Sequence, residues 1–140
     1  MVGRMARVNG RLYLDGGIAD PIPFRQAAAD GHPRRVVVLT RNRGFRKPAP
    51  GRALRVAIRL KYRRFPALAA AVARQAETYN RQLDELETEA AAGRAFVIRP
   101  SRPLAVGRYS QDRAELERLY QNGWADAEAV LPQLRDFLSP

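Results

Sequence analysis

The chain has 140 residues, of which 46% are hydrophobic and 28% charged, and its 25 Lys and Arg outnumber its 14 Asp and Glu. This length and apolar content suit one globular domain over residues 1–140 and exclude a disordered tail or a coiled-coil rod. The chain contains no cysteine and a single histidine, His32, which excludes disulfides and thiol nucleophiles and argues against a Ser-His-Asp triad or a histidine-based metal site. We therefore expect no metal and no cofactor.

The amino-terminal part of the sequence predicts two strands separated by a short helix. Residues 11–14 form a strand-like run that ends at Asp15-Gly16-Gly17, a turn at which the backbone approaches another group closely. Residues 24–30 predict a helix that Gly31 ends. Residues 35–40 form the clearest strand, because their consecutive apolar residues are typical of a strand buried on both faces of a parallel sheet.

The middle of the chain predicts a loop, two helices and a strand. Residues 41–51 form a loop rich in Gly and Pro, and a helix follows over residues 53–64. Apolar residues then recur at steps of three and four over residues 66–92, which predicts one long helix ended by Gly93. Residues 94–100 contain the second apolar strand.

The carboxy-terminal residues predict two further helices. Asp112, with Glu115 three residues later, has the spacing of a capping box, and the helix that begins there is expected to stop at Asn122-Gly123. A last helix over residues 125–138 is expected to kink or restart at Pro132. Helices that alternate with apolar strands predict an α/β domain, layered, with a mostly parallel sheet of few strands flanked by helices.

The excess positive charge lies in one segment, residues 34–64, which holds twelve basic side chains and no acid. Such a segment is either a solvated face or a surface for anionic lipid or nucleic acid. Arginines interleaved with Leu54, Val56 and Leu60 fit a lipid interface better than nucleic acid. The residues that we expect to bind an anionic surface are Arg41, Arg43, Arg46, Lys47, Arg55, Arg59, Arg63 and Arg64.

The sequence also bears on cellular location and on metal binding. No run of about 18 apolar residues occurs, and residues 1–14 lack the apolar core of a signal peptide. We therefore expect a cytoplasmic protein with peripheral contact to the inner membrane face. An acidic run follows in the long helix, at Glu77, Asp84, Glu85, Glu87 and Glu89, and we interpret it as a solvated helix face rather than a metal cluster.

The group Asp15-Gly16-Gly17 follows the carboxyl end of a predicted strand, which is where active sites lie in α/β sheets. A carboxylate in that position can orient or deprotonate a nucleophile. A plain turn between strand and loop accounts for the same residues. On spacing alone, both interpretations stay open.

Residues 13–23, Tyr-Leu-Asp-Gly-Gly-Ile-Ala-Asp-Pro-Ile-Pro, resemble the Asp-Gly-Gly block of patatin-like phospholipases, lipid acyl hydrolases that use a Ser–Asp dyad. Further blocks resemble one bacterial branch of that family, so that the resemblance spans residues 12 to 138; they are residues 37–41, 44–48, 62–68, 79–80, 96–101, 119–120 and 123–124. The resemblance implies a patatin-like fold, a lipid or acyl-ester substrate, Asp15 as the catalytic carboxylate of the dyad, and Gly16 and Gly17 as its active-site loop. It also implies that no histidine is needed.

The chain departs from that family in one respect that decides its expected activity. The family's nucleophile lies in Gly-x-Ser-x-Gly, and neither that pattern nor a glycine-rich oxyanion loop occurs around Ser101, Ser110 or Ser139. The chain resembles the carboxy-terminal half of such an enzyme, so we expect it to be inactive alone. The alternative function is a peripheral module that binds anionic membrane or lipid through residues 34–64, and a nucleic-acid binder is the weaker third.

The resemblance has a consequence for association. A parallel sheet cut at Leu12 leaves a strand edge and apolar helix faces uncovered. We therefore expect homo-oligomers or association with the serine-bearing half.

Overall fold

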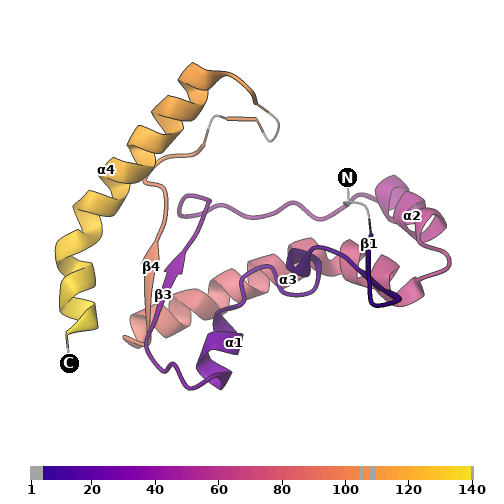
Figure 1. Cartoon of the computed structure of the whole chain (residues 1–140), viewed down its shortest axis with the longest axis horizontal. Helices are drawn as coiled ribbons and strands as arrows, with labels where there is room; N and C mark the ends of the chain where they lie inside the picture. Colours follow the sequence, from indigo (N-terminus) through magenta and orange to yellow (C-terminus); the bar gives the residue numbers. More distant parts are fainter. Residues whose placement is uncertain (1–4, 105, 108–109, 140) are drawn as a thin grey trace. The chain divides into compact units, whose positions relative to one another are not determined.

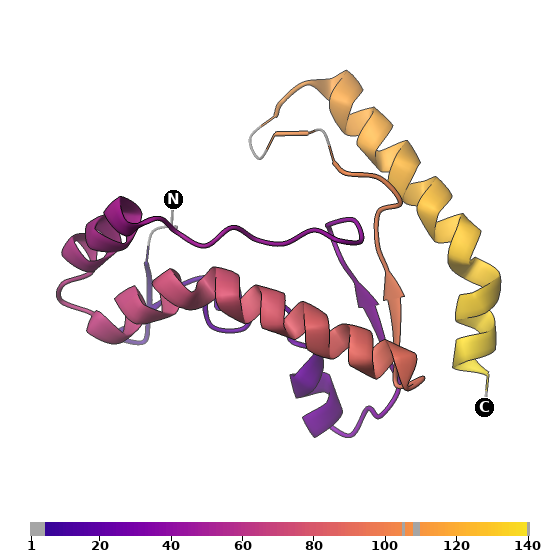
Figure 2. The same ribbon diagram turned by 180° about the vertical axis from the view of Figure 1, so that it is seen from behind.

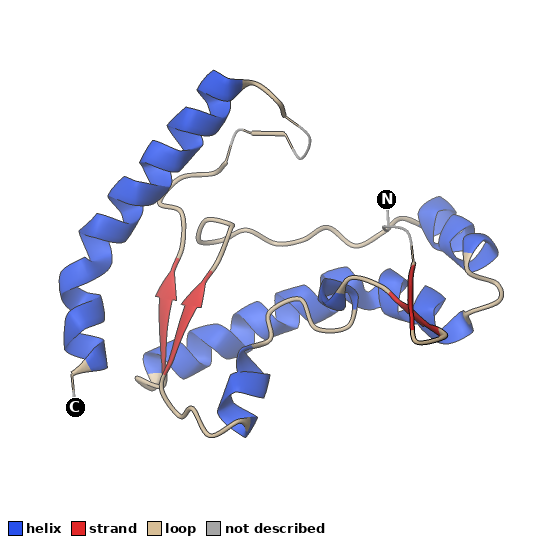
Figure 3. Ribbon diagram, viewed as in Figure 1, coloured by secondary structure: helices blue, strands red, loops and turns tan. Residues whose placement is uncertain are grey.

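The computed structural model describes residues 5–104, 106–107 and 110–139 (Figure 1). The chain forms two compact units, one of Met1–Pro23 with Arg46–Glu85 and the other of Phe24–Phe45 with Leu86–Pro140. The described residues contain four α-helices, one 3₁₀ helix and two two-stranded sheets, one antiparallel and one parallel (Figure 3). The predicted α/β class is confirmed. Within the same residues, every helix is too short or too polar to cross a bilayer.

The first unit begins with a hairpin that the sequence analysis did not predict. Strands β1 (Ala6–Val8) and β2 (Arg11–Tyr13) pair antiparallel around Asn9-Gly10. Asn9 and Gly10 have φ of 49° and 78°, and two positive φ values are what a two-residue hairpin turn requires. The predicted strand at 11–14 is therefore not part of the parallel sheet. It is the second strand of an exposed hairpin, and Asp15 follows that strand.

Helix α2 (Arg52–Lys61) and the part of helix α3 (Pro66–Ala91) up to Glu85 complete the first unit. Helix α2 ends three residues before the predicted Arg64, where tighter turns follow: the backbone N–H of Arg63 donates to the Leu60 carbonyl and that of Phe65 to the Tyr62 carbonyl. Helix α3 confirms the long predicted helix, and Gly93, with φ of 71°, follows its end as expected. The side chains buried in this unit come from the Asp15 loop region, the α2–α3 turn and one stripe of α3; they are Ile22, Tyr62, Ala69, Ala76, Gln82 and Leu83.

The second unit is built on the parallel pair β3 (Arg35–Val38) and β4 (Ala95–Ile98), which lie side by side in Figure 2. Helix α1 (Phe24–Ala29) lies beside β3, and helix α4 (Arg113–Leu138) packs against β4. β3 is not buried on both faces as predicted, since Val36 and Val38 are 40% and 69% exposed. With two strands and one covering helix on each, alternate β3 side chains are left in solvent.

Helix α4 is continuous, so the predicted stop at Asn122-Gly123 and a restart at Pro132 are both wrong, whereas a kink at Pro132 stays a prediction. Its start is as predicted: the Asp112 carboxylate accepts hydrogen bonds from the backbone N–H of Ala114 (2.8 Å) and Glu115 (3.3 Å). An interior glycine costs about 1 kcal/mol and an interior proline about 3 kcal/mol. Packing against β4 outweighs those local preferences, and it includes the tilted rings of Phe137 and Phe96, whose centroids lie 5.6 Å apart.

Candidate functional site

The candidate site is the loop that carries Asp15. The Asp15 carboxylate caps the one-turn 3₁₀ helix η1 (Gly16–Ile18), because its Oδ1 accepts a hydrogen bond of 2.9 Å from the backbone N–H of Gly17. A Cβ at position 17 would lie 3.3 Å from that same Oδ1, so a side chain there would press on the carboxylate. At Gly16 a Cβ would meet nothing within 4 Å, and no contact explains that glycine.

Two glutamines of α3 hold this loop in place. Gln75 Nε2 donates to the carbonyl of Gly17 at 2.7 Å. Gln82 Nε2 donates to the Asp20 carboxylate, and its Oε1 accepts the backbone N–H of Ile22 at 3.0 Å. Gln75 and Gln82 are seven residues apart, about two helical turns, so both lie on the face of α3 toward the loop. The sequence analysis missed them, although polar residues beside a predicted buried stripe are a usable signal.

The geometry leaves one oxygen of Asp15 available. Oδ1 is used for capping, and Oδ2 accepts no hydrogen bond from any described residue of the chain. The side chain is exposed, so a group from outside this loop can reach it. A carboxylate held in that way can accept a proton from a hydroxyl that approaches it.

The serines of this chain are placed elsewhere. The first unit contains no serine, since Ser101, Ser110 and Ser139 all belong to the second. Ser110 Oγ donates to the Glu115 carboxylate at 2.5 Å, and the backbone N–H of Ser101 donates to Asp126. Ser110 thus has a carboxylate partner in Glu115, but it does not lie in a Gly-x-Ser-x-Gly segment, and Ser101 has an aspartate bound only to its backbone N–H.

Replacing Gln82 with Leu is expected to lower the free energy of unfolding by about 1–3 kcal/mol, because it leaves the buried Ile22 N–H and the Asp20 carboxylate without their partner. Urea unfolding measures this change. The control is Gln121→Leu, since the exposed Gln121 donates to Glu117 on its own helix and to no other described residue. Equal midpoints for the two variants would show that Gln82 does not hold the loop.

The acidic run in α3 is solvent-accessible as expected, with Glu77 and Asp84 exposed and the others half-buried, and some of its carboxylates also pair with arginines. Arg46 pairs with Asp84 in the first unit. In the second, Arg43 lies 3.5 Å from Glu87, which Arg99 also binds at 2.6 Å. Among the described residues no group of side chains could hold a metal ion. Arg43 and Arg46, two of the predicted anion-binding residues, thus already have anionic partners.

Glu89 joins β3 to the end of α3 through two arginines. Arg94 donates to it at 3.0 and 2.7 Å, and the buried Arg35 donates at 2.5 Å. The hydrogen bonds from Arg94, opposed by partial burial and reinforced by Arg35, hold the pKa of the Glu89 carboxyl at about 2, below its ordinary 4.5. The same contact raises the pKa of Arg94.

Because the pKa of Glu89 is lower in the folded chain than in the unfolded chain, its contribution to stability is complete above pH 4.5 and is lost as the pH falls toward about 2. Glu89→Gln is therefore expected to destabilise the chain at neutral pH, and its difference from the wild type should shrink over that acid range. Urea unfolding at a series of pH values tests this, with the exposed Glu117→Gln as control. A difference that did not change with pH would contradict it.

The other predicted cations fall into two groups. Arg41 lies over the Phe45 ring at 4.9 Å, and Lys47 Nζ lies 5.8 Å from the Tyr79 ring. Arg55, Arg59 and Arg63 line one pocket of about 720 Å³ between α2 and α3, whereas Arg64 is exposed outside it. The structure therefore divides the basic segment into residues paired with α3 acids or rings and residues grouped at a pocket.

Comparison with known proteins identifies one family. Neither a curated protein nor a solved structure matches the chain. Residues 65–139, which form α3, β4 and α4, match the family described as a domain of unknown function (DUF6363). The matched region contains Gln75 and Gln82 but not the Asp15 loop that they hold. Since the match covers more than half of the 140 residues, the chain belongs to this family.

Proposed function

We propose that this chain supplies the carboxylate of a Ser–Asp dyad to a patatin-like lipid acyl hydrolase, with Asp15 as that carboxylate. One observation supports this above the others. The Asp-Gly-Gly loop is fixed to α3 by Gln75 and Gln82, and Oδ2 of Asp15 accepts no hydrogen bond from the described residues. A plain turn does not need two side chains from 58 and 62 residues further along the chain to hold it.

The proposed chemistry is acyl transfer. A serine hydroxyl from a Gly-x-Ser-x-Gly segment, which these 140 residues do not contain, gives its proton to Asp15 while its oxygen attacks the ester carbonyl. The protonated Asp15 returns the proton to the departing alcohol, which leaves an acyl-serine. Water then gives a proton to Asp15 and attacks the acyl group, and Asp15 returns that proton to the serine oxygen as the fatty acid leaves, which restores the serine hydroxyl and the Asp15 carboxylate. No cofactor takes part in these steps.

In this proposal β3 and β4 belong to a larger, layered parallel sheet that other strands complete. Support comes from apolar side chains left in solvent: Val38 of β3 is 69% exposed, and Tyr120 and Trp124 of α4 are 60% and 56% exposed. The Tyr120 and Trp124 rings also lie together, with centroids 6.3 Å apart, and neighbouring exposed apolar side chains mark surfaces that another chain or segment covers. The partner is the serine-bearing segment or, in its absence, a second copy of this chain.

An assay of the purified 140-residue chain tests whether the nucleophilic serine lies outside these residues. The chain is expected to show no turnover of a short p-nitrophenyl ester and no labelling by a fluorophosphonate probe, because both need an activated serine. A labelled Ser101 or Ser110 would contradict the proposal, since the nucleophile would then lie within the chain.

A second candidate function is peripheral binding to an anionic membrane through α2. Its apolar residues Leu54, Val56 and Leu60 are 56%, 56% and 68% exposed, and the helix presents arginines beside them. Each basic side chain near an anionic surface contributes about 1 kcal/mol, and each apolar side chain that enters the interface about 1.5–3 kcal/mol. Such a surface would bring a lipid hydrolase to its substrate.

Replacing Leu60 with Asp is expected to weaken binding to phosphatidylcholine vesicles that contain phosphatidylglycerol by about tenfold or more, since it replaces an exposed apolar contact with a repelled charge. Vesicle flotation measures the binding. The matched control is Leu116→Asp, which makes the same change on α4 at a residue 44% exposed. An equal effect of both variants would show that α2 is not the membrane-binding surface. Binding to duplex DNA that falls steeply with salt would favour nucleic acid as the partner instead.

A further inference from the structure

The pocket between α2 and α3 combines positive charge with a small apolar floor. Its basic side chains are Arg55, Arg59, Arg63 and Arg74, and a single acid, Glu77, lies among them. The remaining lining residues are Ala49, Tyr62, Pro66, Ala69, Ala70 and Ala73. We propose that this pocket binds the phosphate group of an amphiphilic phosphate ester, with the ester's apolar chain against the alanines of α3.

The arginines of the pocket can bind an added anion, whereas other arginines of the basic segment already pair with acids of α3. Arg59, Arg63 and Arg74 make no hydrogen bond or ion pair with any described residue, and Arg55 uses only its Nε, which donates to the Pro50 carbonyl at 3.2 Å. Three other acids of α3, Asp84, Glu87 and Glu89, pair with arginines outside the pocket. Unpaired guanidinium groups around one cavity are complementary to phosphate, which they bind through paired N–H donors.

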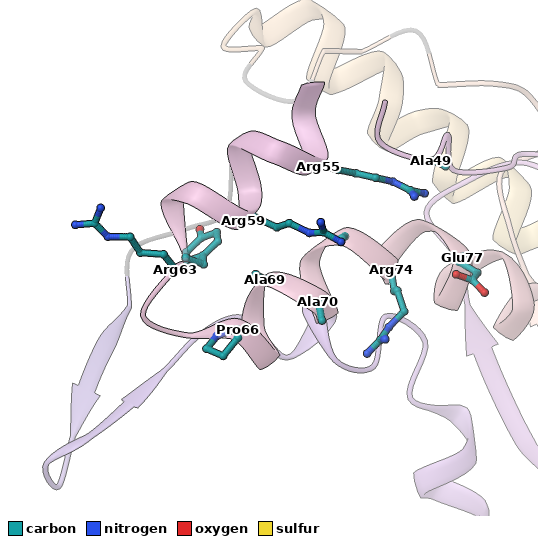
Figure 4. A pocket seen from close by; sticks show the side chains of 11 residues that line it. Ala49, Arg55, Arg59, Arg63, Pro66, Ala69, Ala70, Arg74 and Glu77 are labelled. Atoms are coloured by element: carbon teal, nitrogen blue, oxygen red, sulfur yellow. The ribbon is translucent and has the colours of Figure 1, made fainter. Parts of the chain in front are cut away.

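The positions of the arginines suggest how the phosphate is held. Figure 4 shows Arg55 and Arg59 extending from α2 in the same direction over the α3 side of the pocket, while Arg63 points the other way. Residues 55 and 59 are one helical turn apart, so their guanidinium groups can bind one anion together. Arg55 and Arg59 are therefore the main phosphate ligands in this proposal.

The floor explains why the ligand should carry an apolar chain. Ala69, Ala70 and Ala73 present methyl groups on one side of α3, and Ala69 is 5% exposed. Small side chains leave the volume of about 720 Å³ unfilled, and an apolar chain that entered it would leave water. The same chemistry is found in a phospholipid headgroup with its first acyl carbons and in a soluble alkyl phosphate. The lipid source rests on the membrane binding proposed above, and the soluble source does not; neither uses Asp15.

The experiment measures binding of hexyl phosphate, inorganic phosphate and hexanol to the whole chain by titration calorimetry. Hexyl phosphate is expected to bind more tightly than inorganic phosphate and more tightly than hexanol. Arg59→Glu should weaken that binding about tenfold to hundredfold, since it replaces a charge-assisted donor with a repelling carboxylate. The control Arg52→Glu makes the same charge change on the same helix, outside the pocket, and should have a smaller effect.

A second variant tests the apolar floor without a change of charge. Ala73→Phe fills the pocket and is expected to reduce the affinity for hexyl phosphate to that for inorganic phosphate. If Arg52→Glu weakened binding as much as Arg59→Glu, or if hexyl and inorganic phosphate bound equally to the wild type, the proposal would be overturned. If Arg59→Glu altered the circular dichroism spectrum, Arg59→Ala replaces it, and unchanged affinity in that variant would also overturn the proposal.

Vesicles then distinguish the two sources of the ligand. Phosphatidylcholine vesicles with phosphatidic acid are compared with vesicles without it. Recruitment that depends on Arg59 and that hexyl phosphate reverses would identify a lipid headgroup. Tight binding of hexyl phosphate without recruitment would support the pocket with a soluble phosphate ester as its ligand. Failure of ester hydrolysis at Asp15 would affect neither result, so the two proposals can fail separately.

Discussion

Replacing Asp15 with Asn is expected to lower ester hydrolysis about 10,000-fold in an assembly of this chain with a serine-bearing segment, an effect similar to that of amide substitutions at the carboxylate of other serine hydrolases. The amide oxygen of Asn can still accept the Gly17 N–H, so the loop should keep its geometry. The amide cannot take a proton from serine. The loss should therefore appear in kcat and leave folding unchanged.

The control for this substitution is Asp30→Asn. Asp30 is also exposed and accepts a hydrogen bond from Gln26 at 2.8 Å, but it lies in the second unit, outside the Asp-Gly-Gly loop. Hydrolysis that Asp30→Asn left unchanged and Asp15→Asn abolished would assign the loss to the dyad position. Equal rates for Asp15→Asn and the wild type would remove Asp15 from the mechanism.

Leu86→Ala is expected to lower the free energy of unfolding by about 2–5 kcal/mol, the range found for buried leucines. Leu86 lies near the end of α3 in the second unit and is 0% exposed. Truncation there removes buried methyl groups and leaves a cavity. For a chain with so few fully buried large side chains among its described residues, that is a large share of its total stability.

Urea unfolding monitored by circular dichroism measures the effect of Leu86→Ala. The control is Leu60→Ala, which makes the same truncation at a side chain 68% exposed and should change stability by less than about 0.5 kcal/mol. Equal losses for the two variants would show that Leu86 is not part of a packed core.

The helices show how far periodicity alone predicts this fold. The apolar stripe over residues 66–92 predicts α3, because burial of one face at helical spacing is a local property of the sequence. Three residues of that stripe, Ala76, Leu83 and Leu86, are buried as predicted. In α4 local signals fail, since Gly123 and Pro132 disfavour helix but packing against β4 keeps the helix continuous.

The candidate site could be predicted only in part, because some of its residues are distant in the sequence. Asp15, Gly16 and Gly17 stand together in the sequence, so their pattern is visible there. Gln75 and Gln82 contact that loop from 58 and 62 residues further along the chain, and no local pattern connects them to it. The hairpin at Asn9-Gly10 did have a local signal, the two-residue turn itself.

The pairing of the basic side chains in residues 34–64 could not be predicted from the sequence either. The twelve cations of this segment look equivalent in sequence, but pairing depends on which residues the fold brings near the acids of α3. Arg43 and Arg46 face those acids, and Arg59 faces a pocket instead. Net charge thus predicts an anionic partner for the segment as a whole and cannot tell which arginines are left to bind it.

Asp15 is proposed to serve a serine supplied from outside these residues. A complementation experiment combines this chain with a Gly-x-Ser-x-Gly segment of a patatin-like hydrolase whose own dyad aspartate has been removed, and measures p-nitrophenyl ester hydrolysis. Restored hydrolysis that depends on Asp15 is the predicted result. The same restoration by Asp15→Asn, or no restoration from a complex shown to have formed, would contradict the claim.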